Sequence, residues 1–212
     1  MTIRVVIADD HVLLRDGLKA LLQATGDIEV VGEVGNGHEA LRRVPELKPD
    51  VVLMDIAMPE LNGIEATRAL AEKCPGTRII IVSMHAGSEH VYRALAAGAA
   101  GYLLKESAGA EVVTAVRAVH AGNRYLSRAV AEFGRVDPAR AGASPLERLS
   151  TRERQVLQLV AEGKSSAEIA RLVHLSPKTV ETYRSRLMKK LGVSDIPALV
   201  RLAILHGITP PG

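Results

Sequence analysis

Residues 3–11 read Ile-Arg-Val-Val-Ile-Ala-Asp-Asp-His, a short apolar run that ends abruptly in two acids. Four further runs share its length and its content of Val, Ile and Leu: residues 28–34, 51–54, 78–82 and 101–104. Runs of this kind predict buried strands. Between them lie segments with the helical spacing of apolar residues, around 14–22, 64–71, 91–96 and 112–119. The alternation predicts an α/β fold, with a parallel sheet and helices on both of its faces.

The side chains that follow these strands are chemically unusual. Asp9 and Asp10 follow the first strand, Asp55 the third, Ser83 the fourth and Lys105 the fifth. In a flavodoxin-like, doubly wound (βα)5 sheet, the first and third strands are neighbours and all carboxyl ends lie at one edge, so the acids converge there. Three carboxylates beside an apolar sheet call for a cation, and oxygen ligands favour Mg²⁺.

This combination of groups is suited to carrying a phosphoryl group on an aspartate. A carboxylate can act as a nucleophile and form an aspartyl phosphate. The Lys105 ammonium can neutralise a carboxylate and then hold a phosphoryl oxygen. The Ser83 hydroxyl can donate a hydrogen bond to that oxygen, and a metal would stabilise the charge on the transferring group.

Four motifs occur in the order typical of the receiver domain of bacterial response regulators, which residues 1 to about 122 resemble. The motifs are ADDH (8–11), MDIAMP (54–59), VSM (82–84) and GYLLK (101–105). The resemblance implies that Asp55 is the phosphoacceptor and that a sensor histidine kinase supplies the phosphoryl group. It also implies that the protein is not an enzyme, apart from slow removal of its own phosphoryl group.

The resemblance further implies a set of metal ligands. Asp10 resembles the direct ligand of Mg²⁺ and Asp9 the ligand that acts largely through water. Asp55 and the backbone carbonyl of Ala57 complete the implied set. His11 is a ligand by residue type, but we interpret it as a loop residue.

Several positions leave alternatives open. Ser83 resembles a switch hydroxyl and Tyr102 the aromatic residue that changes rotamer with it, although packing explains Tyr102 equally well. Glu106 stands where many relatives have proline, which leaves open whether the Lys105–Glu106 peptide bond is cis. The glycines within residues 32–37 match neither common phosphate-loop fingerprint and indicate a turn after the second strand.

The second half of the chain differs in charge and pattern. Residues 1–126 have a net charge of −3, whereas residues 150–212 have +5. We predict a receiver domain over 1–122, a linker over 123–146 with a short helix around 128–133, and an all-helical domain over 147–212.

The helices of this last domain have recognisable starts. Capping boxes are predicted at residues 150–153 and 165–168. Ser176 before Pro177 predicts the start of a third helix, and a fourth spans about 196–206. The second and third helices have the spacing of a helix-turn-helix, a motif that reads the major groove of DNA.

On a helical wheel, the third helix of this domain separates two kinds of side chain. Val180, Tyr183, Leu187 and Leu191 fall on the core side, and short polar groups framed by cations fall on the other. Five motifs resemble the LuxR-type helix-turn-helix of NarL/FixJ regulators. They are LSTRERQVL (149–157), AEGK (161–164), EIA (168–170), LSPKTVETYR (175–184) and KLGV (190–193).

This second resemblance implies double-stranded DNA as a partner, bound by a homodimer on two half-sites, with RNA polymerase as a further candidate partner. The implied base contacts, by position, are Lys178, Glu181, Thr182 and Ser185. The implied phosphate contacts are Thr179, Arg184, Arg186 and Lys189. Because relatives carry lysine where this chain has Glu181, no universal base code follows, although a glutamate can accept from cytosine N4.

Composition excludes several other classes. No apolar run reaches the length of a membrane span, and the start lacks the apolar core of a signal peptide, so we expect a cytoplasmic protein with no membrane partner. The single cysteine, Cys74, excludes a disulfide framework and a cysteine-based zinc site. Aromatic residues make up only 2% of the chain, which argues against stacking of single-stranded nucleic acid.

Two functions from other classes compete with a phosphorylation-controlled DNA-binding protein. An aspartate-based phosphatase would use the same acids, but it usually carries a second acid where this chain has Ala57. A non-nucleic-acid adaptor would use the basic tail to bind another protein. A receiver that is no longer phosphorylated is a third alternative, and the presence of every expected residue argues against it.

Overall fold

The computed structural model of the chain describes residues 2–133 and 144–209. It divides into two compact units, residues 1–141 and 142–212, which are described separately. The first unit contains the acidic residues singled out above, and the second contains the helix-turn-helix segment.

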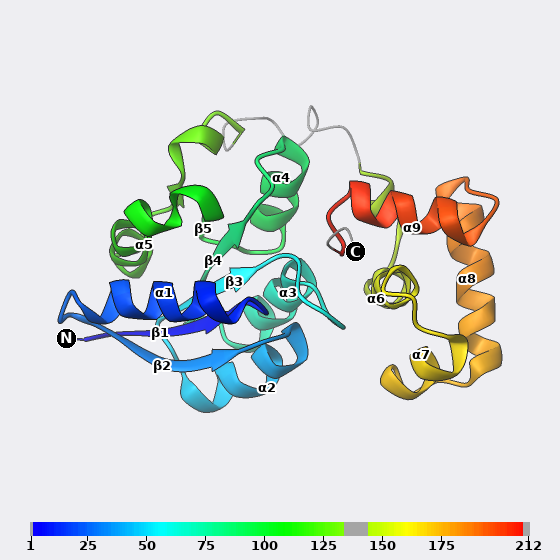
Figure 1. Cartoon of the computed structure of the whole chain (residues 1–212), viewed down its shortest axis with the longest axis horizontal. Coiled ribbons are helices and arrows are strands. Elements are labelled where there is room, and N and C mark those ends of the chain that lie inside the picture. The colour runs from blue at the N-terminus through cyan, green and yellow to red at the C-terminus, as the bar shows by residue number, and fades with distance from the viewer. Residues whose placement is uncertain (1, 134–143, 210–212) are drawn as a thin grey trace. The chain divides into compact units, whose positions relative to one another are not determined.

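A parallel sheet with the strand order β2-β1-β3-β4-β5-β6 forms the centre of the first unit (Figure 1). Five of its strands lie where the apolar runs predicted them: β1 (Ile3–Ala8), β2 (Ile28–Val34), β3 (Val51–Asp55), β4 (Arg78–Ser83) and β5 (Gly101–Leu104). β1 pairs in parallel with both β2 and β3. The predicted flavodoxin-like order, with the first and third strands as neighbours, is therefore confirmed.

A sixth strand corrects the predicted count of five. β6 (Tyr125–Leu126) pairs in parallel with β5 and is followed by a short 3₁₀ helix, η1 (Arg128–Val130). The sheet thus extends past residue 122, into the segment predicted as linker. A strand of two residues is too short to show the alternation that a sequence pattern requires, which is why this strand escaped prediction.

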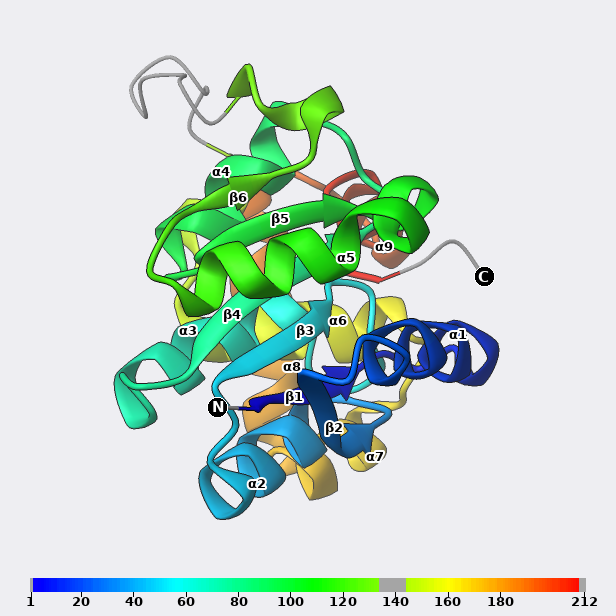
Figure 2. The same cartoon turned by 90° about the vertical axis from the view of Figure 1, so that its left-hand side faces the viewer.

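Helices cover both faces of the sheet. α1 (Val12–Gln23) and α5 (Lys105–His120) pack on one face, which is turned towards the viewer in Figure 2. The other face is covered by α2 (Gly37–Leu47), α3 (Gly63–Lys73) and α4 (Ser88–Ala96). α2 is the fifth helix that the (βα)5 prediction requires, although its apolar spacing is not among the four patterns given above. Because successive strand side chains point to opposite faces, each strand contributes to two separate apolar cores.

Helices are the only regular elements of the second unit among the residues that the structure describes. A 3₁₀ helix, η4 (Pro145–Arg148), precedes the four predicted helices: α6 (Thr151–Ala161), α7 (Ser166–Leu172), α8 (Pro177–Leu191) and α9 (Ile196–Leu205). Val156, Leu157, Val180 and Leu187 are among the fully buried residues of a single apolar core. Both predicted capping boxes are formed, and Ser176 caps α8 with Pro177 at its first position.

The capping box of α6 does more than begin a helix. The Glu153 carboxylate accepts a hydrogen bond from the Ser150 N–H at 2.8 Å and forms an ion pair with Lys190 of α8 at 2.8 Å. Burial acts to raise the pKa of Glu153, but Lys190 and Ser150 outweigh it and hold the pKa below its ordinary value of 4.5. One side chain therefore ties the start of α6 to the end of α8.

We expect Glu153→Ala to lower the free energy of unfolding of the second unit by about 2 kcal/mol, because a cap and the hydrogen-bonded ion pair of a buried carboxylate with a partly exposed lysine are lost together. Since folding lowers the pKa of Glu153, its contribution is fully present above pH 4.5 and is lost as the pH falls through the folded-state pKa. Urea unfolding at pH 7 and at a series of pH values below 4.5 measures both effects. The exposed capping box of α7 supplies the control, because Glu168→Ala should lower the free energy of unfolding by less than Glu153→Ala does. Equal reductions in the two variants would show that the ion pair with Lys190 adds nothing.

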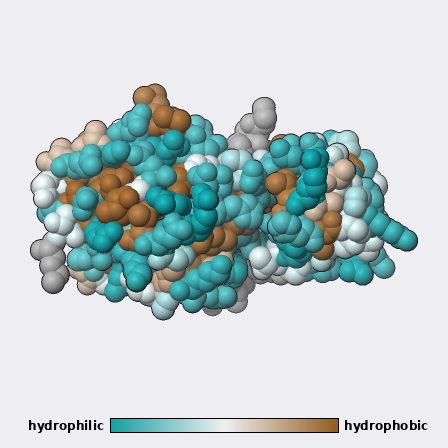
Figure 3. Space-filling model, turned by 90° about the horizontal axis from the view of Figure 1, so that it is seen from below, coloured by the Kyte–Doolittle hydropathy of each residue, from teal (hydrophilic) through white to brown (hydrophobic). Residues whose placement is uncertain are grey.

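No helix among the described residues is long and apolar enough to cross a membrane. Figure 3 shows hydrophilic residues over most of the visible surface, with hydrophobic residues in patches between them.

Candidate functional site

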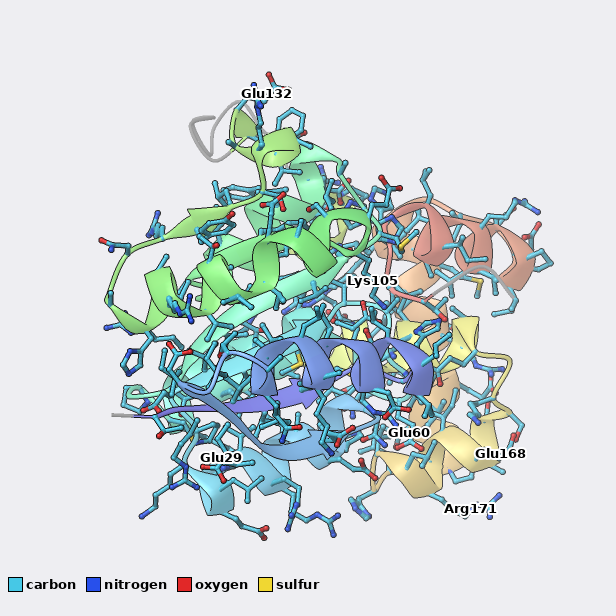
Figure 4. All side chains as sticks on the ribbon, turned by 60° about the vertical axis from the view of Figure 1, so that its left-hand side comes forward. Glu29, Glu60, Lys105, Glu132, Glu168 and Arg171 are labelled. Carbon is cyan, nitrogen blue, oxygen red and sulfur yellow. The ribbon has the colours of Figure 1, made fainter. Side chains whose placement is uncertain are left out.

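The carboxyl edge of the sheet brings the predicted acidic residues together. The Lys105 ammonium lies 2.8 Å from Asp9 Oδ2 and 2.9 Å from Asp55 Oδ2. Both aspartates are only 2% exposed. Lys105 is the first residue of α5, so it projects from the end of β5 into this edge, where Figure 4 labels it. The convergence of Asp9, Asp55 and Lys105 matches the sequence prediction.

Asp10 and His11 complete the acidic edge. His11 Nδ1 lies 3.0 Å from Asp9 Oδ1 and 2.9 Å from Asp10 Oδ1, and the His11 N–H donates to Asp9 at 2.8 Å. Asp9, Asp10, His11 and Asp55 each offer one ligand atom, and these atoms all lie within 4.8 Å of one another. His11 lies in the loop between β1 and α1, as predicted, and it also contacts both acids. The position of His11 directly after Asp9 and Asp10 in the sequence is the signal that could have shown this contact.

The connection from β3 to α3 fixes Asp55 at this edge. The Gly63 N–H donates to the Ile56 carbonyl at 2.9 Å, and Asn62 caps α3 by accepting from the Glu65 N–H at 3.1 Å. A Cβ atom at Gly63 would lie 1.9 Å from the Asp55 carbonyl oxygen. Only glycine permits this close approach, which holds the loop against the residue that carries the carboxylate.

The electrostatic balance favours an ionised Asp55 at neutral pH. Burial raises the pKa of Asp55 to about 6, helped by the charge of Asp9 and opposed by Lys105 and a backbone hydrogen bond from Ala57. Burial acts to lower the pKa of Lys105, but the two carboxylates outweigh it and raise that pKa above its ordinary value. An ammonium and a buried carboxylate in contact, with the carboxylate ionised above about pH 6, suit a nucleophilic aspartate.

Ser83 and Tyr102 meet at the loop after β4. The Ser83 hydroxyl accepts a hydrogen bond from the His85 N–H at 3.1 Å, and the Tyr102 hydroxyl donates to the His85 carbonyl at 2.6 Å. Tyr102 is fully buried, and burial raises its pKa to about 12. Both side chains thus hold the same residue, an arrangement that fits the predicted switch pair as well as simple packing.

The peptide bond after Lys105 is trans, as are all others in the described part of the chain. The alternative that Glu106 left open is resolved in this way, and α5 begins directly at Lys105.

The exposed face of α8 carries most of the predicted DNA contacts. The exposed members of that set are Lys178, Glu181, Thr182, Ser185, Arg186 and Lys189. On the opposite side, Val180 and Leu187 are buried and Tyr183 and Leu191 are partly buried, as the wheel predicted. The helix-turn-helix therefore presents short polar groups and cations to the solvent.

Two of the eight predicted contacts are less accessible. Arg184 donates to the Lys164 carbonyl at 2.9 Å, and its side chain is only 19% exposed. The Thr179 hydroxyl lies 2.8 Å from the Ser176 hydroxyl, where it is drawn into the cap of α8. Arg184 therefore braces α8 against the turn before α7, a role that the wheel could not reveal because Lys164 is distant in sequence.

Two protein-family models match the chain. Residues 5–117 match the model of the response regulator receiver domain. Residues 147–203 match that of the bacterial regulatory proteins of the luxR family.

Two response regulators match almost the whole chain. The chain is 38% identical to the response regulator UvrY of Escherichia coli (strain K12), over 97% of this chain and 95% of that protein. It is 40% identical to the response regulator GacA of Pseudomonas viridiflava, over 97% of each. Among solved structures, the two-component response regulator RcsB in complex with DNA is 28% identical, with a TM-score of 0.61 over 99% of this chain and 100% of that one. A LuxR-family response regulator from Aurantimonas sp. SI85-9A1 is 39% identical, with a TM-score of 0.60 over 62% of this chain and 94% of that one.

Proposed function

Because this chain belongs to the NarL/FixJ-type response regulators and is a two-component transcription regulator, we propose that it takes a phosphoryl group on Asp55 from a histidine kinase and then binds DNA as a dimer. The contact of Lys105 with both Asp9 and Asp55 carries the first half of this proposal. The exposed polar and cationic face of α8 supports the second half. We continue to expect a cytoplasmic location.

The transfer step uses groups already in place. A lone pair of the Asp55 carboxylate attacks the phosphorus of a phosphohistidine, and an acyl phosphate forms on Asp55. The P–N bond breaks, and the imidazole nitrogen keeps its electron pair and takes up a proton. Lys105, now paired with Asp55, can hold a phosphoryl oxygen instead, and Ser83 can donate a hydrogen bond to another. Slow loss of the phosphoryl group to water is the only turnover we propose, because Ala57 offers no side chain to orient a water molecule.

The acidic edge fits Mg²⁺. Three carboxylates, those of Asp9, Asp10 and Asp55, face one lysine ammonium, so the edge retains net negative charge and offers the oxygen ligands that Mg²⁺ prefers. Asp10, Asp9, Asp55 and the Ala57 carbonyl would hold the ion. When bound, the ion would neutralise charge on the phosphoryl oxygens.

Magnesium is expected to stabilise the first unit against heat. At an ion concentration of about ten times Kd, the gain is about 1.4 kcal/mol. Asp10→Ala should abolish the gain, whereas Asp16→Ala, which removes an exposed acid from α1, should leave it intact. Scanning calorimetry with and without MgCl₂, at constant ionic strength, gives the measurement; an equal gain in both variants would place the ion elsewhere.

We further propose that phosphorylation acts on a population of two states. Ser83 moves towards the phosphoryl group and gives up the hydrogen bond that it accepts from the His85 N–H. Tyr102 then changes rotamer and gives up its hydrogen bond to the His85 carbonyl. The surface around β4 and β5 then changes, which biases the chain towards DNA-binding dimers.

Selection of binding sites from a pool of random duplexes, with and without acetyl phosphate, tests the proposed function as a whole. We expect one enriched motif with two half-sites, and stronger enrichment with the phosphodonor. A pool that yields no motif under either condition would favour a protein partner for the basic tail instead.

A further inference from the structure

A cluster of hydrogen-bonded side chains joins the strand β6 to the first turns of α5. Its members are Ser107, Glu111, Tyr125 and Ser127, called here the Ser127 cluster. Glu111 Oε2 accepts from the Tyr125 hydroxyl at 3.0 Å and from the Ser127 hydroxyl at 3.1 Å. The hydroxyls of Ser107 and Ser127 lie 3.0 Å apart. None of these residues belongs to the acidic edge described above.

Ser127 extends the pairing of β6 with β5 by means of its side chain. Its N–H donates to the Tyr102 carbonyl at 2.9 Å, and its hydroxyl oxygen accepts from the Leu104 N–H at 3.3 Å. The Ser107 hydroxyl approaches the Leu104 carbonyl at 3.3 Å. The cluster therefore contacts both backbone polar groups of Leu104, the residue immediately before Lys105.

The hydroxyl of Ser127 has its full set of partners. A hydroxyl can donate one hydrogen bond and accept two. Ser127 donates to Glu111, accepts from the Leu104 N–H, and is within reach of the Ser107 hydroxyl. Because the residue is only 1% exposed, water cannot replace these bonds, and loss of the hydroxyl would leave the Leu104 N–H without this acceptor.

We propose that Ser127 is a positioning residue for Lys105, acting through the backbone of Leu104. The inference rests on the proposed phosphorylation of Asp55. The Lys105 ammonium reaches Asp9 and Asp55 at 2.8 and 2.9 Å from a side chain that is 9% exposed, so it has little room to compensate for a shift of its own backbone. Small errors in the placement of a reacting group are costly in rate.

The position of Ser127 in the chain gives this arrangement a second consequence. Ser127 directly follows β6, in the stretch through which the chain leaves the sheet towards its second unit. The lysine that faces the phosphoacceptor is thus fastened to the segment that directly follows the last strand of the first unit.

A double-mutant cycle on the full chain tests the proposal, with the rate of phosphoryl uptake from acetyl phosphate and Mg²⁺ as the measurement. We expect Ser127→Ala to slow uptake roughly tenfold, since a displaced ammonium meets the phosphoryl oxygens poorly. In a Lys105→Ala background, Ser127→Ala should have no further effect, because the group on which it acts is gone. Thr77→Ala is the matched control, since it removes a hydroxyl that donates to the Pro49 carbonyl, and it should leave the rate unchanged.

A second variant keeps the proposal open to refutation if Ser127→Ala is unstable. Tyr125→Phe removes only one donor to Glu111 and should slow uptake less than Ser127→Ala does. Amide hydrogen exchange at Leu104, followed by NMR, should become faster in Ser127→Ala and stay slow in Ser127→Thr, which keeps the hydroxyl.

The outcomes separate this inference from the proposed function. No uptake by the wild type would overturn the proposed function and the positioning role with it. Uptake by the wild type at a rate that Ser127→Ala and Tyr125→Phe both leave unchanged would overturn the positioning role alone. An equal slowing by Ser127→Ala with and without Lys105 would also overturn it, because Ser127 would then act on the fold in general.

Discussion

Asp55→Ala is expected to abolish phosphoryl uptake and, with it, any effect of acetyl phosphate on DNA affinity. The wild type should bind its selected duplex on the order of tenfold more tightly after treatment with acetyl phosphate and Mg²⁺, a typical coupling between two sites. The variant should bind with one affinity under both conditions. The physical reason is that the substitution removes the proposed nucleophile, the carboxylate that lies 2.9 Å from the Lys105 ammonium at the end of β3.

The variant should remain folded, because Lys105 keeps its ion pair with Asp9 and a buried carboxylate whose pKa is raised to about 6 is removed. Asp16→Ala, which removes an exposed acid, is the matched control and should behave as the wild type. Mass spectrometry of the intact chain measures uptake, and fluorescence anisotropy measures binding. Equal affinity of the wild type and Asp55→Ala, each measured with and without acetyl phosphate, would rule out control by phosphorylation.

The second large effect is expected on the exposed face of α8. The double variant Arg186→Ala, Lys189→Ala should weaken binding to the selected duplex and to random duplexes alike, because these two cations are proposed phosphate contacts, and such contacts carry no sequence information. Since the double variant removes two cations from each subunit of a dimer, the slope of log affinity against log salt should become shallower by roughly 3 to 4. Titrations at several salt concentrations provide the measurement.

Two comparisons make this prediction specific. Thr182→Ala with Ser185→Ala should cost about 1–3 kcal/mol on the selected duplex only and leave the salt slope unchanged, since these exposed side chains are the proposed contacts to base edges. Arg201→Ala removes an exposed cation from α9 and should alter neither property. If Arg201→Ala shifted the salt slope as strongly as the double variant on α8, the DNA would lie on a different face.

Much of this protein follows from local pattern. The branched apolar runs predicted five strands to within a residue at each end, since a strand buried on both faces has little choice of composition. The capping boxes of Ser150 and Ser165 were predictable because a cap is satisfied within four residues. The convergence of the acids at the strand ends could be predicted from the sequence because parallel strands share one carboxyl edge.

What the tertiary structure decided depends on contacts between residues far apart in the chain. β6 forms because Tyr125 and Leu126 pair with the free edge of β5. Two residues are too few to show the alternating pattern of a strand in the sequence. Arg184 braces α8 through the Lys164 carbonyl, and Ser127 reaches Leu104 across 23 positions. Such bonds depend on where two segments come to lie in space, and residue spacing along one helix or strand holds no record of that.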